Sequence, residues 1–264
     1  MTIDSDTTIT RDGVRKLVGH FINPEIGAVT GDVQVRNMKT NLLTRLITYR
    51  YWSAFHQERA AQSLFRTVMC CSGPFSAYRR SAIEEVKDDY VSQVFLGQEC
   101  TFGDDRHMTN LMLRSGQKVV FDAQAVSHTE VPTNLKQYVR QQVRWNKSFY
   151  REMLWSLRHI KKPHPYLLAD LLLQAALPFM LMVALGLTAW QATEGKEALV
   201  RYVLVLMGIA VLRAGYGVYR TKDPGFLLFV VYGFLHVLVL MPVRLWALFT
   251  MRRTHWGTRT APAT

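Results

Sequence analysis

The pattern of apolar and polar positions divides the chain into two parts. Residues 1–162 carry charges throughout, whereas residues 166–250 are mostly Leu, Val, Ala, Phe and Met. In the first part, short apolar stretches typical of strands alternate with stretches of helical periodicity. This alternation predicts an α/β layered domain, and the second part predicts helices that lie in a membrane.

The apolar pattern also predicts individual elements of the first part. Strands are expected at Thr2-Ile3 (the end of one), Ile26–Val35, Thr67–Ser72 and Lys118–Val126, and helices at 12–22, Leu42–Arg66 and Asp104–Arg114. Asn23-Pro24 ends the first helix, and Gly116 closes the last. Ligands of α/β sheets bind beyond the carboxyl ends of strands, and Asp4-Ser5-Asp6 follows such an end.

Residues 145–162 are predicted to form an amphipathic helix at the membrane surface. Apolar side chains recur there at helical spacing, with basic residues off the apolar stripe: Trp145, Phe149, Met153, Leu157 and Ile160 against Lys147, Arg151 and Arg158. An interfacial helix has this composition. A helix that packs on the domain core has it too, so both interpretations stay open.

Residues 163–251 are predicted to form the transmembrane region. Two segments, at about 166–190 and 198–219, reach the roughly 20 residues that a crossing needs. Lys161 and Lys162 precede the first, and Arg220 and Lys222 follow the second. The positive-inside rule therefore predicts a multi-pass protein of the plasma membrane whose domain 1–144 is cytoplasmic.

A third apolar segment, residues 226–250, is expected to be broken at Pro242. If it crossed the membrane fully, the basic residues of 252–264 would lie outside, against the positive-inside rule. Either the segment does not cross fully, or a preceding part of a longer protein changes the count. The first residues look like the end of an apolar run, so we expect the chain to continue a longer one.

The net charge of +12 suits a phosphate-bearing substrate, an anionic polymer or the lipid bilayer. Nucleic acid is not expected, because no nucleic-acid-binding pattern is present and the basic residues gather beside the apolar segments. The three cysteines, Cys70, Cys71 and Cys100, include one adjacent pair. Such a set predicts reduced thiols in the cytosol and no disulfide framework.

Two acidic motifs are candidates for chemistry. Asp4-Ser5-Asp6 presents two carboxylates in one loop, which suits a hard divalent cation, although a turn or a helix cap uses the same residues. Asp104 and Asp105 open a predicted helix. Adjacent carboxylates raise each other's pKa, as a general base requires, whereas plain N-capping is the alternative.

Basic and aromatic residues supply the remaining candidates. Arg106 can serve a diphosphate or pair with a neighbouring acid, and His107 is expected to be structural. Arg144 can hold a phosphate through two parallel hydrogen bonds. Trp145 offers a flat face for a sugar ring, or it anchors the chain at the membrane interface.

Together these motifs resemble the processive family-2 glycosyltransferases of membranes, which include cellulose, chitin, chitooligosaccharide and hyaluronan synthases. The shared pattern is D-x-D, an acidic pair ending in Asp, and Q-x-x-R-W, here Gln141–Trp145. Hyaluronan synthases are the most similar, over Gly31–Val35, Arg50-Tyr51-Trp52, Glu58-Arg59-Ala60, Ser72-Gly73-Pro74, Cys100–His107, Lys147-Ser148 and Trp256–Arg259. Chitooligosaccharide synthases share much of this.

The resemblance implies an α/β domain of the glycosyltransferase-A type that lacks its first βα units. It implies Asp105 as the general base, Asp6 as the main ligand of Mg²⁺ or Mn²⁺, and Asp4 on the nucleotide side. It also implies substrate binding by Asp104, Arg106, Gln141, Arg144 and Trp145, and by Trp256, Thr258 and Arg259 in a cytosolic gating-type loop within 252–264. The sequence does not predict an oligomeric state.

The function implied is the transfer of N-acetylglucosamine, with glucuronate in hyaluronan, from UDP donors to a growing polysaccharide, with inversion. Alternatives are a chitin or chitooligosaccharide synthase, a non-processive lipid-linked sugar transferase, and an inactive fragment. Members of the family carry transmembrane helices and uridine-binding βα units before the D-x-D. We therefore expect these 264 residues alone to bind a UDP-sugar poorly.

Overall fold

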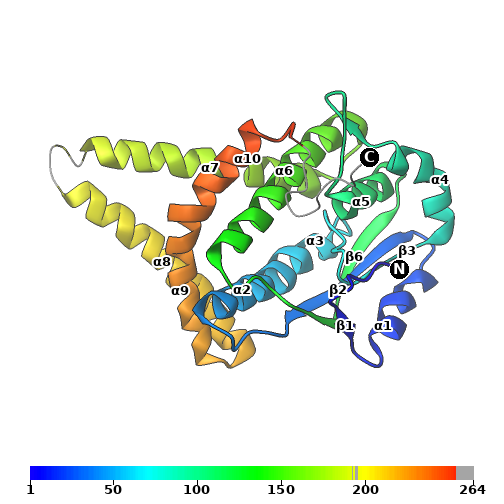
Figure 1. The fold of residues 1–264 in the computed structure, drawn as a ribbon, viewed down its shortest axis with the longest axis horizontal. Coiled ribbons are helices and arrows are strands. Elements are labelled where there is room, and N and C mark those ends of the chain that lie inside the picture. The colour runs from blue at the N-terminus through cyan, green and yellow to red at the C-terminus, as the bar shows by residue number, and fades with distance from the viewer. Residues whose placement is uncertain (192, 194–195, 254–264) are drawn as a thin grey trace, which may run out of the picture.

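The computed structural model describes residues 1–191, 193 and 196–253. A layered domain built on a sheet lies at one end, and a pair of long helices extends away from it (Figure 1). The strands are β1 (Thr8–Ile9), β2 (Ile26–Val35), β3 (Ser76–Tyr78), β4 (Val94–Phe95), β5 (Gln98–Glu99) and β6 (Lys118–Thr129). The helices of the layered domain are α1 (Gly13–Gly19), α2 (Leu42–Ser53), α3 (Ala60–Leu64), α4 (Arg80–Val91), α5 (Asp104–Arg114) and α6 (Leu135–His159).

The sheet has the strand order β1-β6-β2-β3, with β2 and β6 parallel and the outer strands antiparallel to them. Thr2 adds an isolated antiparallel bridge to Ser76, beside β3. Six residues later, Thr8 pairs with His128 at the other side of the sheet. Asp4-Ser5-Asp6 therefore crosses the sheet near the carboxyl half of β2, where the sequence predicts a ligand.

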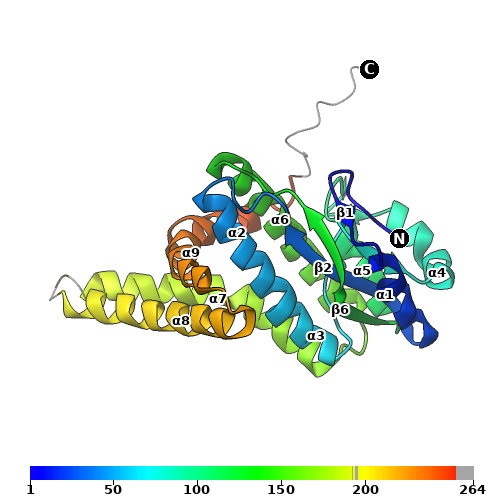
Figure 2. The ribbon, with the colours of Figure 1, turned by 90° about the horizontal axis from the view of Figure 1, so that it is seen from below.

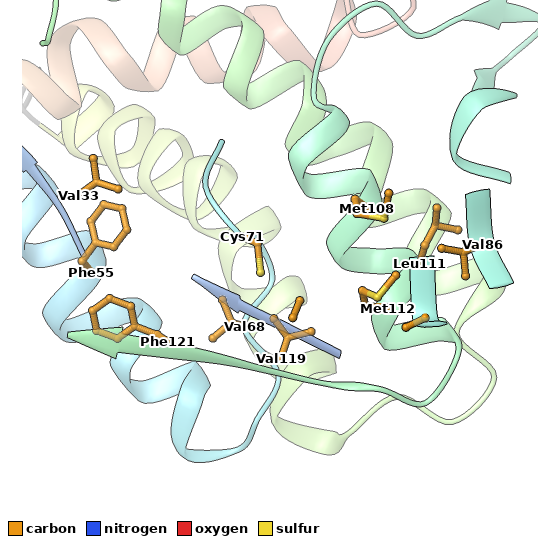
Figure 3. Close-up of a cluster of buried hydrophobic side chains, with 12 residues drawn as sticks. Val33, Phe55, Val68, Cys71, Val86, Met108, Leu111, Met112, Val119 and Phe121 are labelled. Carbon is orange, nitrogen blue, oxygen red and sulfur yellow. The ribbon is translucent and has the colours of Figure 1, made fainter. Parts of the chain in front are cut away.

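Both faces of the sheet are covered, as the nearly continuous burial of β2 requires. On one face α1 contributes Leu17 to a core with Val29, Phe75 and Val120. On the other face, side chains from the sheet, from α4, α5 and the α2–α3 segment, and from the 67–72 stretch form a second core, which Figure 3 shows with Phe55, Val119, Phe121, Leu111 and Met112 labelled. The acidic start of α5 is thus fixed above the sheet.

The long helix predicted over Leu42–Arg66 is present as α2, a π-helical segment (Ala54–Arg59) and α3. Asn41 caps its start, because its side chain accepts from the Thr44 N–H and Thr44 Oγ1 accepts from the Asn41 N–H. The helix predicted over 12–22 is present as α1 and a 3₁₀ turn (His20–Ile22). α5 has the bounds that the sequence predicts.

The strand expected over Thr67–Ser72 is wrong. Only Thr67 forms a bridge, parallel to Val119. Beyond it, side chains replace the strand ladder, because the Cys71 N–H donates to Thr109 Oγ1 (2.9 Å) and the Ser72 N–H donates to Thr30 Oγ1 (3.2 Å). The structure adds β3, α4 and the β4–β5 hairpin, which the sequence analysis did not predict, and it extends β6 to Thr129.

The helix expected to begin at residue 145 is also corrected. α6 begins at Leu135, where Asn134 accepts from the Gln137 N–H, so residues 145–159 are its second half. Lys147 and Arg151, which we expected on a solvated basic side, are 9% and 1% exposed. The polar side of this helix therefore packs on the protein, and its position relative to a membrane stays a prediction.

Among the described residues, three segments are long and apolar enough to cross a membrane: α7 (Pro165–Gln191), α8 (Glu197–Thr221) and residues Pro224–Phe249. α7 and α8 project from the layered domain in both views (Figures 1 and 2), and in Figure 1 they are close at their outer ends and diverge toward the domain. Most of their large apolar side chains are exposed, among them Leu173, Leu204 and Leu212.

The third segment is helical throughout, as a 3₁₀ turn (Pro224–Leu228), α9 (Phe229–Leu235), a π-helical segment (His236–Leu240) and α10 (Met241–Phe249). At Pro242 the regular α-helix is interrupted, but the helical path continues: the π-helical segment ends at Leu240 and α10 begins at Met241, so Pro242 stands in the first turn of α10, where a missing N–H costs little. The segment packs on α2 and α6, and the Tyr138 and Tyr232 hydroxyls are 2.9 Å apart.

Candidate active site

The Asp4-Ser5-Asp6 segment is a turn fixed at both ends. The Thr7 N–H donates to the Asp4 carbonyl oxygen at 3.0 Å. Thr129 Oγ1, at the end of β6, donates to Asp6 Oδ1 at 3.3 Å. On the other side Asp4 contacts Gly73, where an added Cβ would lie 3.1 Å from Asp4 Oδ1. Both carboxylates are therefore presented at the surface by a short, anchored loop.

Asp105 lies opposite this turn, in the first turn of α5. Its Oδ1 accepts from the Arg106 N–H at 2.7 Å, and its Oδ2 accepts from Cys70 Sγ at 3.5 Å. Thr109 Oγ1 donates to the Asp105 carbonyl oxygen at 2.8 Å and accepts from the Cys71 N–H. The 70–72 stretch thus holds the half-buried Asp105 in place.

Electrostatics join the four acids into one cluster. The pKa of Asp4 is raised by burial and then by the charges of Asp6, Asp105 and Asp104. The pKa of Asp105 is raised chiefly by burial and also by Asp104, although Arg106 opposes this. We call Asp4, Asp6, Asp104 and Asp105 the front cluster. A carboxylate with a raised pKa that touches a cleft suits a proton acceptor.

Trp145 belongs to the same neighbourhood through Tyr51 of α2. The Tyr51 and Trp145 ring centroids are 6.4 Å apart. The pKa of Tyr51 is raised mainly by burial, with contributions from the charges of Asp4 and Asp6. Trp145 is 44% exposed, so part of its side chain is open to solvent and can contact a sugar ring.

Gln141 and Arg144 share the face of α6 that carries Trp145, since residues three and four apart are neighbours on a helix. Gln141 Oε1 is buried and has no hydrogen-bond partner among the described residues. Burial lowers the pKa of the half-buried Arg144. Nearby, Lys147 Nζ donates to the Arg253 carbonyl oxygen at 3.3 Å. This face carries an amide, a guanidinium and an ammonium group, which are the kinds of group that bind a diphosphate or a sugar hydroxyl.

The other predicted residues separate into two groups. Asp104 is exposed at the start of α5, and Arg106 faces α6, with its Cζ 5.5 Å from the centre of the Phe149 ring. Trp256, Thr258 and Arg259 lie outside the described residues. The sequence analysis missed Tyr51 and Cys70 as neighbours of the acids. The one signal for Cys70 was its place in the buried stretch that ends at Gly73-Pro74.

A divalent cation fits this turn only if the substrate completes its coordination. Within the described part of the chain, no three His, Cys, Asp or Glu side chains are close enough together to hold a metal ion. Mg²⁺ commonly binds one or two carboxylates together with substrate phosphates and water. Asp6 and Asp4 supply such a pair, so the residues fit a cation that arrives with a nucleotide diphosphate.

Two cavities lie outside the front cluster. One, of about 90 Å³, is lined by Arg50, Gln142, Asn146, Tyr232, His236, Leu240 and Arg244, between α2, α6 and the third apolar segment. The other, of about 220 Å³, is lined by Asp89, Ser92, Gln93, Val94, His107, Arg114, Trp155 and His159. The larger cavity contains no predicted site residue, so its size does not mark the chemistry.

The fold is that of a glycosyltransferase. The chain is similar to the mannosyltransferase PcManGT from Pyrobaculum calidifontis, solved in complex with GDP-Man and Mn²⁺, with a TM-score of 0.56 and 20% identity. The match covers 90% of this chain and 61% of that one. It confirms the predicted α/β glycosyltransferase fold.

The family model described as chitin synthase matches residues 1–250, and the chain belongs to this family of glycosyltransferases. It is 40% identical over 263 residues to an N-acetylglucosaminyltransferase of Azorhizobium caulinodans, which covers 98% of this chain and 65% of the relative. It is 39% identical over 262 residues to a hyaluronan synthase of Streptococcus pyogenes, covering 98% of this chain and 62% of the relative. The predicted membership is confirmed, and the chain spans less than two thirds of these relatives.

Proposed function

We propose that this chain is part of a membrane-embedded polysaccharide synthase that transfers N-acetylglucosamine from a UDP donor to a growing chain. One observation supports the proposal: Asp6, Asp104 and Asp105 each raise the pKa of Asp4, and Tyr51, whose pKa is raised in part by Asp4 and Asp6, has its ring centroid 6.4 Å from that of the exposed Trp145. Relatives named as an N-acetylglucosaminyltransferase and a hyaluronan synthase support the sugar and the reaction class.

The front cluster and α6 divide the work of transfer. Asp105 accepts the proton of the acceptor hydroxyl as its oxygen attacks the anomeric carbon, and the bond from that carbon to the diphosphate oxygen breaks. Attack opposite the leaving UDP inverts the anomeric configuration. Trp145 supports the acceptor sugar, and Gln141 and Arg144 bind the diphosphate. A divalent cation held by Asp6 and Asp4 would neutralise charge on the departing UDP.

The apolar helices suit an enzyme whose product leaves through or along a membrane. α7, α8 and the third segment are each long enough to cross one. The third segment packs directly on α6, which carries the acceptor platform. With the basic residues on the domain side of α7 and α8, this arrangement supports a cytoplasmic catalytic domain and a polymer that extends toward the bilayer.

The test measures sugar incorporation and product length in membranes. Membranes bear either the chain as given or a fusion that places before Met1 the residues of the Azorhizobium relative that precede its match to this chain. Labelled UDP-N-acetylglucosamine is supplied alone or with UDP-glucuronate. Polymer from one donor indicates a chitin-type product, and a requirement for both indicates a hyaluronan-type product. A product with a single added sugar on lipid would contradict the proposal.

Trp145→Ala distinguishes polymerisation from single transfer. If the ring holds the acceptor sugar, its loss should shorten the product as well as slow its formation. Trp190→Ala is the matched control, because Trp190 is 67% exposed at the end of α7 and has no proposed role at the front cluster. A product of normal length after Trp145→Ala would argue against Trp145 as the platform.

A further inference from the structure

A second carboxylate site lies on the other side of α5. Glu152 of α6 is 3% exposed. Gln93 Nε2 donates to its Oε1 at 2.6 Å, Asn110 Nδ2 donates to its Oε2 at 2.8 Å, and His107 Nδ1 lies 3.1 Å from Oε2. A buried carboxylate needs such partners, and these join α6 to α5 and to the segment after α4.

The loop before α5 is held by the same helix. Arg151 is 1% exposed, and its Nη2 donates to the Phe102 carbonyl oxygen at 2.7 Å while its Cζ lies 4.3 Å from the centre of the Phe102 ring. Gly103 touches Ser148, because an added Cβ would lie 2.1 Å from Ser148 Oγ. We call Ser148, Arg151 and Glu152 the α6 clamp.

The clamp connects the two halves of the candidate active site. α6 carries Trp145 two turns before Glu152, and α5 carries Asp105 two residues before His107. Two residues turn about 200° around a helix, so Asp105 and His107 point to opposite sides of α5. The helix therefore presents the base on one side and is bound to the acceptor helix by the other.

We propose that Glu152 is a positioning residue, which fixes Asp105 at the distance from Trp145 at which an acceptor hydroxyl, rather than water, attacks the donor. This inference rests on the proposed function. A misplacement of about 1 Å in a reacting pair can cost on the order of a hundredfold in rate. If Asp105 is misplaced, water can replace the acceptor, because water does not need Trp145 to hold it. Water then attacks the anomeric carbon and releases its proton to Asp105, and the products are a free sugar and UDP.

The experiment measures the ratio of sugar transferred to UDP released, in the fusion and in the chain as given. Glu152→Ala should lower this ratio by about tenfold or more, with the KM for the donor changed less than about twofold. A defect that merely reduces the amount of folded protein lowers both quantities equally and leaves the ratio unchanged. An unchanged ratio would overturn the proposal.

Milder variants keep the test informative if Glu152→Ala folds poorly. Glu152→Gln keeps an oxygen for Asn110, and the Gln93 amide can rotate to accept from the new amide, so most of the ratio should return. Asn110→Ala removes one of the partners and should lower the ratio less than Glu152→Ala. The control is Asp122→Ala, which breaks another histidine–carboxylate contact, His20–Asp122 at 2.9 Å, on the α1 side of the sheet. Its ratio should not change.

Hydrogen exchange separates this proposal from the proposed function. Glu152→Ala should speed amide exchange across residues 102–110, and Asp122→Ala should not. Equal exchange in both variants would show that the clamp does not hold α5 and would overturn the proposal even in an inactive protein. If the unsubstituted fusion neither transfers sugar nor releases UDP while the exchange result holds, the proposed function fails and the structural half of the inference stands.

Discussion

The two carboxylate sites on either side of α5 differ in how their charge is satisfied. In the front cluster the pKa values of Asp4 and Asp105 are raised, because burial and neighbouring acids disfavour their ionised forms. Behind α5, each carboxylate oxygen of Glu152 has a nitrogen of a neighbouring side chain within 3.1 Å. The front site is partly open to solvent, whereas the Glu152 side chain is buried.

This difference distinguishes the site that we expect to take part in the reaction from the site that holds α5 and α6 together. Acids whose hydrogen-bond donors do not offset burial and neighbouring negative charge can take up a proton, a cation or a diphosphate–cation pair, which is why perturbed carboxylates mark functional sites. A buried carboxylate surrounded by donors has no capacity left for a ligand, and losing one partner leaves uncompensated groups. Substitutions in the front cluster should therefore affect mainly the reaction, and substitutions around Glu152 should affect mainly how α5 is held.

The largest effect should follow Asp105→Asn. General-base catalysis contributes on the order of 10²–10⁴-fold, so sugar transfer in the fusion should fall by that factor while donor binding persists. Initial rates of incorporation and equilibrium binding of UDP would measure the two parts. The control is Asp89→Asn, which removes an exposed acid of α4 that pairs with Arg114 of α5. This variant should retain activity. A loss of less than about tenfold would remove Asp105 from the role of base.

Gly103→Ala tests the clamp through stability. Gly103 has φ +87°, and an added Cβ would lie 2.1 Å from Ser148 Oγ and 2.7 Å from Ser148 Cβ. Left-handed strain costs about 1–2 kcal/mol and overpacking about 1–3 kcal/mol, so the free energy of unfolding should fall by about 2–5 kcal/mol. Denaturant midpoints would measure this.

Gly97→Ala is the matched control for that substitution. Gly97 has φ +78°, and no described atom lies within 4 Å of an added Cβ, so only the backbone strain applies. The double variant Gly103→Ala with Ser148→Gly should recover the packing part of the loss. Equal destabilisation by Gly97→Ala and Gly103→Ala would show that α6 does not press on the loop before α5.

The sequence predicted α5 well because its determinants are local. Two acids stand in its first turn, and Gly116 follows its end. The motifs also selected Asp6, Asp105 and Trp145, whose roles stay predictions; the structure brings Asp6 and Asp105 within electrostatic reach of Asp4. The strand expected at 67–72 failed because its partners are the side chains of Thr30 and Thr109, which periodicity cannot register.

The parts that the sequence did not reveal depend on contacts between distant residues. Glu152 is satisfied by Gln93, His107 and Asn110, which are 42 to 59 residues away along the chain. Tyr51 lies in a long helix whose apolar spacing indicates only a packed face. Such residues become recognisable once the helices are placed, because no local pattern distinguishes a positioning carboxylate from a solvated one.

Asp104→Asn should change the pH profile of the reaction. The charge of Asp104 is one of the causes that raise the pKa of Asp105, after burial. Removing that charge lowers the pKa of Asp105, so the base is ionised at lower pH, and the acidic limb of kcat/KM should move toward lower pH. Rates of transfer across mildly acidic pH would show this. A shift toward higher pH would contradict the assignment of the two acids.

The smallest expected effect is on stability. Its direction tests the difference between the front cluster and the Glu152 site. A carboxyl whose pKa is raised by folding stabilises the fold below its ordinary value of about 3.9, and that contribution is lost as pH rises through the raised pKa. Asp105→Asn should therefore raise the thermal midpoint more at about pH 7.5 than at about pH 4.5.

Asp12→Asn provides the opposite case. The pKa of Asp12 is lowered by its hydrogen bond with Lys16, so its removal should not raise the midpoint at neutral pH. If Asp105→Asn also failed to raise the thermal midpoint at neutral pH, the front cluster would not hold unfavourable charge in the free protein. Its acids would then be compensated like Glu152, and the contrast that assigns chemistry to one side of α5 would be lost.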